Sequence, residues 1–300
     1  MALSPDTSSA ARPALAEPPL CQPPQPPRRR PRVPLPEGSC DTHVHIVGPA
    51  ARYPLDARRN YTPLACSLAQ YRQAMSRCGI ARAVLVQPSF YGTDNRALLD
   101  ALREGGTGFR GVVVMPADTS DDDIAAMDKL GVRGLRLNLV NPQMVSLDDA
   151  VALCARVATR GWHLQLQMRA DEAGAARLAR IAGCTELPLV VDHFGRPPSL
   201  QPPPALLGLL ASGRAYVKLS APYRLTATLG ADLRPLVRAC AQANPERLLW
   251  ASDWPHTELF DTPAPHDADL VDLLALWLPD AALRHQVCVG NPARLYGYPA

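Results

Sequence analysis

Residues 40–47 read CDTHVHIV, and this run decides both the fold and the place of the chemistry. Side chains on a strand alternate between its two faces, so His43 and His45 project from the same side. Two adjacent imidazoles can bind a metal ion or donate hydrogen bonds to one oxygen atom. For this pair alone, the chance proximity of two surface histidines is an equally good explanation, and the rest of the chain must decide.

Seven further short apolar runs follow, separated by segments with helical periodicity. The expected strands are 40–47, 82–88, 110–115, 134–139, 162–168, 188–193, 215–220 and 248–252. Runs such as AVLV and GVVV are apolar without alternation, which is typical of parallel strands covered on both faces. Eight strands that alternate with helices predict a single α/β domain over residues 37–300, a (β/α)8 TIM barrel.

Helix boundaries in the sequence agree with this alternation. Ser67 and Gln70 have the spacing of a capping box. Ser120 precedes three aspartates, which favour the positive end of a helix, and Gly131 is placed to end that helix. These aspartates therefore have a structural explanation, and we do not count them as catalytic.

The first 36 residues differ in composition from the rest of the chain. They contain eleven of its 32 prolines and the run Arg28-Arg29-Arg30. Such a segment buries too little apolar surface to compensate for the entropy of ordering its backbone. We expect residues 1–36 to form a disordered or polyproline-like tail.

Charge and composition limit the partners and the compartment. The net charge is only +3, and little of it falls on the predicted barrel, which argues against nucleic acid. No apolar run approaches the roughly 18 residues that a membrane span needs, and the N-terminus lacks a secretory pattern. The eight cysteines include no CxxC and read as buried thiols in a reducing compartment. We expect a cytoplasmic protein, monomeric or homo-oligomeric, without a membrane partner.

Active sites of such barrels lie at the C-terminal ends of the strands. The polar residues expected there are His43, His45, Ser89, Arg136, Asn138, Gln167, His193, Arg196, Arg224, Asp253 and His256. A buried Arg136 requires an anionic partner, either a substrate or an ion pair with Asp192 or Asp253. His193 alone would be interpreted as a hydrogen-bonded core residue, but His43, His45 and Asp253 are expected at the same end and favour a functional role.

The residue types in this group indicate a reaction. Asp253 can act as general base on a water molecule. The histidines can polarise a carbonyl oxygen, directly or through a divalent metal. Arginines bind carboxylates with two parallel charge-assisted hydrogen bonds. Together these groups predict hydrolysis of a carbonyl compound that carries at least one carboxylate.

The motifs that carry these residues resemble a known group of enzymes. HxH at 43–45, VDHFGRP at 191–197 and SDWPH at 252–256 resemble the amidohydrolase superfamily. More closely, the chain is similar to the 2-pyrone-4,6-dicarboxylate lactonase branch of its "amidohydrolase 2" group. This similarity runs from about residue 40 to residue 296, and it includes GVRGLRLN at 131–138 and NPARLYG at 291–297.

The resemblance implies a lactone hydrolase that works without a metal on a small anionic lactone. It assigns water activation to Asp253, and polarisation of the lactone carbonyl to His43, His45 and His193. The substrate-binding set that we expect consists of Arg136, Arg196, Arg224, Tyr61, Ser89, Gln167, Asn138 and His256.

Two departures from the lactonase pattern bear on the substrate. Pro142 stands where the dicarboxylate lactonase has a second arginine, six residues after the one that matches Arg136. Gln167 stands where it has a tyrosine. Loss of an arginine that clamps a carboxylate costs a dianionic substrate about 1.5–3 kcal/mol. We therefore expect a lactone with one carboxylate, or a sugar-acid or muconolactone-type ring.

Three other functions remain open at this point. A zinc-dependent amidohydrolase or decarboxylase would use His43, His45, His193 and Asp253 as ligands. No lysine or glutamate on the fourth strand is placed to bridge two metals, which argues against a binuclear site. A sugar-acid lactone isomerase needs the same polarised carbonyl. A ligand-binding barrel without activity would have no use for Asp253 beside three histidines.

Overall fold

Eight parallel strands follow one another in chain order around a barrel in the computed structural model. The strands are β1 (Cys40–Val44), β2 (Arg82–Val86), β3 (Phe109–Val113), β4 (Val132–Asn138), β5 (His163–Gln167), β6 (Leu189–Val191), β7 (Ala215–Ser220) and β8 (Leu248–Ala251). A parallel bridge between Val44 and Trp254 joins the last strand to the first, where the His45 N–H donates to the Trp254 carbonyl at 2.8 Å. The predicted (β/α)8 barrel is confirmed.

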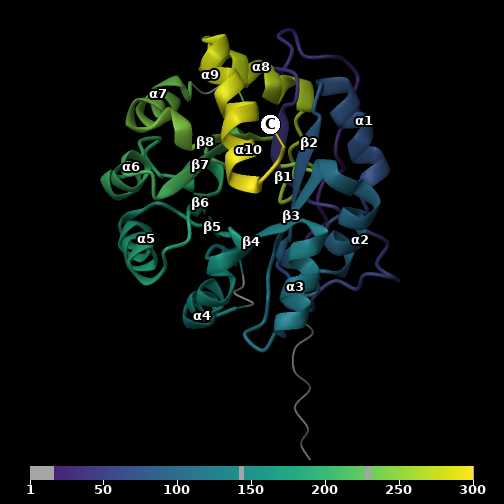
Figure 1. Ribbon diagram of the computed structural model, residues 1–300. Coiled ribbons are helices and arrows are strands. Elements are labelled where there is room, and N and C mark those ends of the chain that lie inside the picture. Colours follow the sequence, from purple (N-terminus) through teal and green to yellow (C-terminus); the bar gives the residue numbers. More distant parts are fainter. Residues whose placement is uncertain (1–16, 142–144, 227–228, 230–231, 300) are drawn as a thin grey trace, which may run out of the picture.

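Helices surround the strands as an outer ring (Figure 1). They are α1 (Leu68–Cys78), α2 (Arg96–Gly105), α3 (Asp121–Leu130), α4 (Leu147–Val157), α5 (Glu172–Cys184), α6 (Pro204–Ala211), α7 (Arg234–Ala243), α8 (Asp267–Trp277), α9 (Ala281–His285) and α10 (Asn291–Tyr296). The structure describes residues 17–141, 145–226, 229 and 232–299. Within these residues no helix has the length and apolar character needed to cross a membrane.

Local sequence signals account for these boundaries. Ser67 accepts a hydrogen bond from the Gln70 N–H and the Gln70 side chain accepts one from the Ser67 N–H, which completes the expected capping box of α1. Ser120 caps α3 above its acidic first turn, and Gly131 ends that helix in the left-handed conformation. Strand β1 is shorter than expected because Val47 leaves the barrel to pair antiparallel with Cys66.

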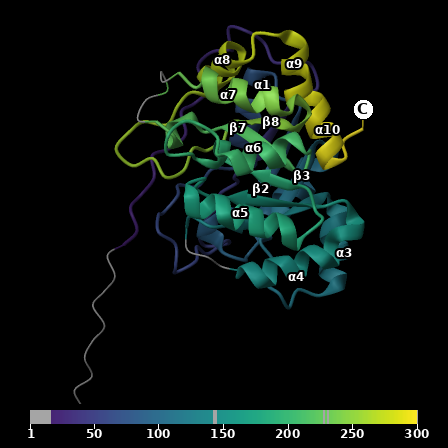
Figure 2. The ribbon, with the colours of Figure 1, turned by 90° about the vertical axis from the view of Figure 1, so that its left-hand side faces the viewer.

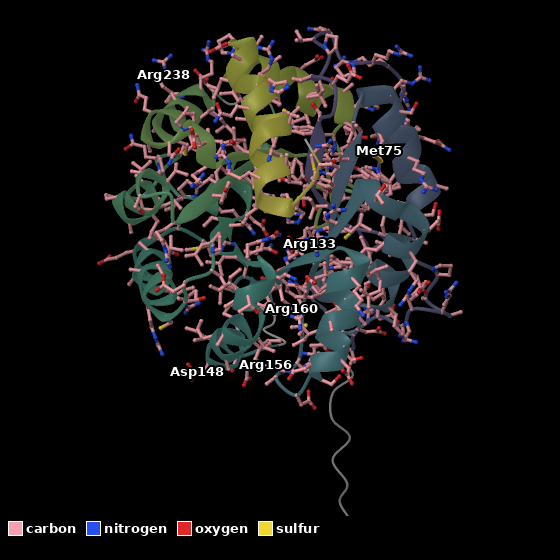
Figure 3. The ribbon with its side chains drawn as sticks, viewed as in Figure 1. Met75, Arg133, Asp148, Arg156, Arg160 and Arg238 are labelled. Atoms are coloured by element: carbon pink, nitrogen blue, oxygen red, sulfur yellow. The ribbon has the colours of Figure 1, made fainter. Side chains whose placement is uncertain are left out.

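The lower part of the barrel interior is an apolar cluster. Its members are Cys40, Val84, Val86, Val112, Val190, Tyr216, Leu249, Leu295, Tyr296 and Tyr298. Helix α10 and the residues after it cover this end of the barrel (Figures 1 and 2), and the Tyr298 hydroxyl donates to the Ala83 carbonyl at 2.9 Å. Charged side chains such as Asp148 and Arg238 are exposed on the outer helices (Figure 3). Among the described residues, packing of apolar and aromatic side chains therefore dominates this end of the barrel.

Residues 17–36 belong to the segment whose composition predicts a disordered tail, and here they lie along the barrel. The Cys21 N–H donates to the Thr62 carbonyl at 2.8 Å, and Cys21 itself is buried. Further on, Arg29 forms ion pairs with Asp269 and Asp272 of α8. Backbone hydrogen bonds and ion pairs to the barrel hold this segment in place, and composition alone gives no sign of them.

Candidate active site

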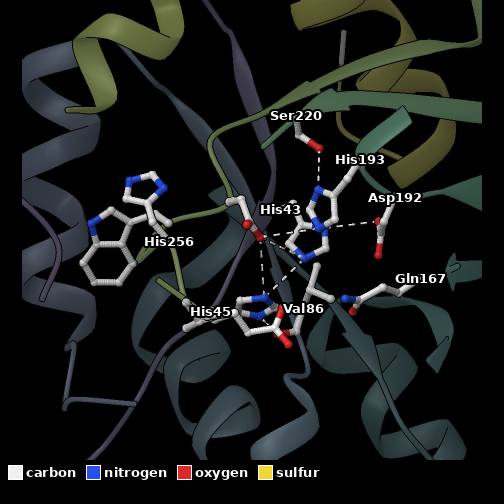
Figure 4. Close-up of polar contacts among 12 residues, drawn as sticks. His43, His45, Val86, Gln167, Asp192, His193, Ser220 and His256 are labelled. Carbon is white, nitrogen blue, oxygen red and sulfur yellow. Dashed lines mark hydrogen bonds and ion pairs between the residues drawn. The ribbon is translucent and has the colours of Figure 1, made fainter. Parts of the chain in front are cut away.

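Four of the predicted residues meet at the C-terminal end of the barrel. His43 lies in β1 and His45 just after it, His193 follows β6, and Asp253 follows β8. None of the four side chains is more than 4% exposed. Figure 4 shows the three imidazoles gathered around one carboxylate. The strand ends thus bring together residues that lie up to 210 positions apart in the sequence.

The atoms that face one another in this group are three imidazole nitrogens and one carboxylate oxygen. Oδ1 of Asp253 lies 3.6 Å from Nε2 of His43, 3.8 Å from Nε2 of His45 and 3.7 Å from Nε2 of His193. The Nε2 atoms of His43 and His45 are 3.3 Å apart. Among the described residues Oδ1 has no hydrogen-bond partner, although it is fully buried. We call these four atoms the Nε2–Oδ1 cluster.

The outer ring nitrogens determine which protons the cluster carries. Nδ1 of His45 lies 2.7 Å from the Val86 carbonyl, which can only accept, so this nitrogen carries the proton of a neutral ring. Nδ1 of His43 lies 3.2 Å from the Asp192 carboxylate, which favours the same tautomer. Nδ1 of His193 pairs at 2.8 Å with the Ser220 hydroxyl, which can donate or accept. The Nε2 atoms of His43 and His45 therefore both present lone pairs to the cluster.

Burial keeps all three imidazoles neutral. It lowers the pKa of His45 to about 4 and that of His193 to about 3, and it holds the pKa of His43 well below its usual value. Burial acts to raise the pKa of Asp253, but the positive charge of Arg224 and the interactions with His193, His43 and His45 together hold this pKa well below the usual range. At neutral pH the cluster thus consists of neutral imidazoles and an ionised carboxylate.

The second oxygen of Asp253 is fully occupied. Oδ2 accepts from the Tyr223 hydroxyl at 2.7 Å and from Nε of Arg224 at 2.9 Å. Arg224 also pairs with Glu258 and donates to the Thr257 carbonyl at 3.0 Å. Its guanidinium is therefore committed to the Asp253 side of the site. These contacts leave Oδ1 as the one atom of Asp253 that is free to accept a proton.

A second buried group lies on the other side of His43. Asp192 contacts His43 at 3.2 Å and Nζ of Lys218 at 3.3 Å, and it accepts from Gln165 at 3.1 Å. Lys218 is fully buried in β7, and burial lowers its pKa to about 8. The charge pair holds Asp192 ionised, so that it fixes the ring of His43. The sequence pointed to Asp192 only as a possible ion-pair partner of Arg136, and it gave no role to Lys218, which lies on the expected strand 215–220.

Arg136 points into the barrel, as its alternation with leucines predicts. It donates to the Gln87 carbonyl at 2.7 Å and to the side chain of Gln167, and it lies 3.6 Å from Asp192. Asn138 donates to the same Gln167 oxygen at 3.1 Å. Nε of Arg136 is buried without a partner among the described residues. Arg136 is thus partly held by the protein, and both the ion-pair and the substrate-binding interpretations keep support.

A cavity of about 450 Å³ opens beside the cluster. It is lined by Pro19, Asn60, Tyr61, Val140, Asn141, Arg169, Arg196, Tyr223, Arg224, Glu258, Leu259 and Phe260. Nε and Nη1 of Arg196 are buried and have no partner among the described residues. Arg169, which follows β5, was not among the residues that the sequence singled out. Its position two residues after Gln167, past a strand end, is a signal that could have found it.

The remaining predicted residues differ in their distance from the cluster. Ser89 bonds to Tyr61 at 3.3 Å, beside the cavity. His256 does not join the three imidazoles: its Nε2 pairs with Asp267 at 3.0 Å, and its Nδ1 lies 3.3 Å from the Tyr223 hydroxyl. Figure 4 shows it on the far side of the cluster from Asp192. Pro142, where the lactonases have an arginine, lies outside the described residues.

The donor set of the cluster also fits a divalent metal ion. Imidazole nitrogens and a carboxylate oxygen are common zinc ligands. The ligand atoms of His43, His45 and Asp253 all lie within 4.8 Å of one another. The Val86 carbonyl and Asp192 hold the outer nitrogens, as partners of metal-bound histidines commonly do. Nε2 of His43, Nε2 of His45 and Oδ1 of Asp253 are three acceptors in close proximity, and either a metal ion or an N–H on Nε2 of His193 would lie between them.

Comparison with known proteins agrees with the motifs. The family model described as amidohydrolase matches residues 40–298. The chain is 36% identical over 277 residues to a 4-sulfomuconolactone hydrolase of Rhizobium radiobacter, across 88% of this chain and 91% of that protein. It is 32% identical over 285 residues to a 2-pyrone-4,6-dicarboxylate hydrolase of Comamonas testosteroni, across 89% of this chain and 92% of that one.

A solved structure shows the same architecture. The crystal structure of an Agrobacterium tumefaciens protein, in its apo form, has a TM-score of 0.81 to this chain at 27% identity. The match covers 90% of this chain and 99% of the other. The predicted resemblance is therefore confirmed over the whole barrel. The chain belongs to the amidohydrolase family.

Proposed function

We propose that this chain hydrolyses the ester bond of a small anionic lactone. The observation that carries the proposal is the Nε2–Oδ1 cluster, in which a buried, ionised carboxylate oxygen without a partner faces three imidazoles. A structural ion pair would satisfy both oxygens of Asp253, whereas here only Oδ2 is satisfied. The similarity to lactone hydrolases supports the same reaction.

Asp253 is the general base in this proposal. Its Oδ1 takes a proton from a water molecule, whose oxygen adds to the lactone carbonyl carbon. The ring C–O bond then breaks, the proton returns to the leaving alkoxide, and the product is a hydroxy acid. Tyr223 and Arg224 hold Oδ2, so that the carboxylate stays ionised and oriented during the cycle.

The negative charge that develops on the carbonyl oxygen requires a cation or a hydrogen-bond donor at the cluster. His43 and His45 orient two lone pairs toward this point, because their outer nitrogens are fixed by Asp192 and Val86. A divalent ion held by His43, His45, His193 and Asp253 would act as a Lewis acid when bound. In a metal-free enzyme, a neutral His193 whose Nδ1 accepts from the Ser220 hydroxyl would carry its proton on Nε2 and donate it as a hydrogen bond to that oxygen.

The cavity supports an anionic substrate. Arg196 offers two buried N–H groups without partners, and Arg169 adds a second positive charge to the same wall. The guanidinium of Arg224 is already engaged by Asp253 and Glu258. Among the described residues that line this cavity, Arg196 is the one guanidinium with buried N–H groups that lack partners, and one such group suits a single carboxylate or sulfonate better than two, which agrees with the loss of an arginine at Pro142.

The test combines metal content with turnover of lactones that carry one carboxylate, one sulfonate or no charge. We expect hydrolysis of the anionic lactones, and a loss of about 10²–10⁴-fold in kcat for Asp253→Asn. Asp128→Asn is the matched control, because Asp128 lies on the outer helix α3 and should leave kcat near the wild-type value.

Metal analysis before and after chelation identifies the cation. Near-stoichiometric zinc, with activity lost on chelation and restored by the ion, would make the three histidines and Asp253 ligands. Activity that resists a chelator in a metal-poor protein would assign polarisation of the carbonyl to an imidazole N–H of the cluster. An enzyme that opens no lactone, or an Asp253→Asn variant with full activity, would contradict the proposal.

A further inference from the structure

The segment of residues 18–22 connects two loops of the active-site end of the barrel. On one side, the Thr62 N–H donates to the Pro19 carbonyl and the Cys21 N–H donates to the Thr62 carbonyl, both at 2.8 Å. On the other side, the Gln22 N–H donates to the Leu259 carbonyl at 2.7 Å, and its side chain donates to the Phe260 carbonyl. The segment thus joins the loop after β1 to the loop after β8. Figure 2 shows the N-terminal chain at the end of the barrel opposite α10.

The loop after β8 has an unusual backbone. Asp253, His256 and Glu258 adopt φ values of 64°, 65° and 62°, in the left-handed region that side chains other than glycine rarely occupy. Such a conformation persists only when surrounding contacts hold it. Contacts of the 18–22 segment fall on this loop, because the Glu258 N–H donates to Sγ of Cys21 at 3.4 Å and the next two carbonyls accept from Gln22.

These contacts connect the segment to the proposed base. Cys21 fixes the backbone of Glu258, the Glu258 carboxylate pairs with Arg224, and Arg224 bonds to Oδ2 of Asp253. Pro19 also lines the same cavity as Arg196 and Arg224. The segment therefore bears on both the carboxylate and one wall of the substrate site.

We propose that residues 18–22 are a positioning element of the active site, which holds the loop of residues 253–260 in its left-handed conformation and closes one wall of the cavity. The composition of the tail gives no reason to expect this role. The predicted effect on turnover rests on the proposed lactone hydrolysis, whereas the effect on the loop does not.

The test is Gln22→Pro in the full-length chain. Proline removes the backbone N–H and the side-chain donor at once, and it suits the extended backbone of this proline-rich segment. Gln25→Pro is the matched control, because Gln25 makes no hydrogen bond to any described part of the chain. The readouts are amide hydrogen exchange of the peptide covering 253–260, kcat and KM on the anionic lactones, and the melting temperature.

In Gln22→Pro we expect the amide hydrogens of residues 253–260 to exchange at least tenfold faster than in wild type. We also expect kcat/KM to fall at least tenfold, through both a lower kcat and a higher KM. Gln25→Pro should match wild type. Exchange and kinetics within twofold of wild type in Gln22→Pro would overturn the proposal, and so would faster exchange with unchanged kinetics.

Two further results separate the possible failures. If the wild-type protein opens no lactone, the proposed function fails, while the exchange measurement still decides whether the segment holds the loop. If Gln22→Pro does not fold, Cys21→Ala decides in the same way, since it removes the buried thiol that accepts from the Glu258 N–H and keeps the backbone hydrogen bonds of the segment. Unchanged exchange at Glu258 in that variant would overturn the proposal.

Discussion

The two ends of the barrel interior are equally buried but differ in how they are stabilised. The lower end is an apolar cluster closed by Tyr296 and Tyr298, whose burial removes hydrocarbon from water. The upper end holds Asp192, Lys218 and Asp253, each less than 1% exposed. Buried charges are costly unless they are paired. A protein that keeps such charges at one end only has a use for them there beyond stability.

Along its six residues, strand β7 passes from the apolar layer of the barrel interior to the polar layer. Tyr216 belongs to the apolar cluster, Lys218 donates to the Thr42 carbonyl and to Gln165 at 2.8 Å, and Ser220 bonds to His193. All three project inward, as period-2 alternation requires. The strand therefore runs from a layer that is satisfied by packing to one that is satisfied by hydrogen bonds. Among the described residues, Oδ1 of Asp253 is the carboxylate oxygen of the upper layer that has no hydrogen-bond partner, and this is where we place the chemistry.

The largest effect on stability is expected at the upper end, for Lys218→Met. Methionine has a similar length but no charge, so Asp192 would lose its buried cation. Removing one partner of a buried pair costs about 3–5 kcal/mol of the free energy of unfolding. Denaturant unfolding measures this loss. The only other lysine of the chain, Lys129, is exposed on α3, and Lys129→Met should change stability by less than about 0.5 kcal/mol. Equal stabilities for the two variants would remove the distinction between the layers.

A smaller effect is expected from His163, which starts β5. Burial lowers its pKa to about 3, whereas an unfolded histidine has a pKa of about 6.5. Below pH 6.5 the unfolded chain therefore binds a proton that the folded chain does not. This residue's contribution to stability is lost as the pH falls from 6.5 toward 3, by up to about 1.4 kcal/mol per pH unit.

His163→Leu removes this contribution and keeps an apolar contact for Tyr296. Between pH 6 and pH 4, the free energy of unfolding of the variant should fall by roughly 2 kcal/mol less than that of wild type. The remaining pH dependence belongs to the other buried groups, since His45 and His193 shift in the same direction. Parallel stability curves for wild type and variant would show that His163 is charged in the folded protein.

The fold could be predicted from the sequence because its signals are local. The runs around residues 83–86 and 111–114 are apolar without alternation, and Ser67 with Gln70 gives a helix start, so each element has its own evidence. The same reason made the central site residues predictable from the sequence, namely His43, His45, His193 and Asp253. Each lies at a strand end, and a closed barrel brings strand ends together.

The rest of the site depends on contacts between distant segments, which no local pattern carries. Nothing near Arg224 shows that Asp253 and Glu258 occupy its guanidinium. Lys218 lies on an expected strand, but its pairing with Asp192 becomes visible only when β6 and β7 are placed side by side. The contact of Cys21 with Glu258 joins residues 237 positions apart. From its composition, the tail could be predicted only to be disordered or polyproline-like, without any indication of which of its residues contact the barrel.

The smallest effect is expected at the lower end, for Tyr298→Phe. The phenylalanine ring keeps the apolar contacts and the packing of Arg110 over the ring, and the Ala83 carbonyl loses the hydroxyl that donates to it. We expect a loss of about 1 kcal/mol in the free energy of unfolding, the usual net value of one hydrogen bond. The kcat and KM on the anionic lactones should stay at wild-type values, because the apolar cluster lies between this residue and the Nε2–Oδ1 cluster. A change in kcat without a change in stability would show that the two ends of the barrel are coupled, and that the lower layer does more than support the fold.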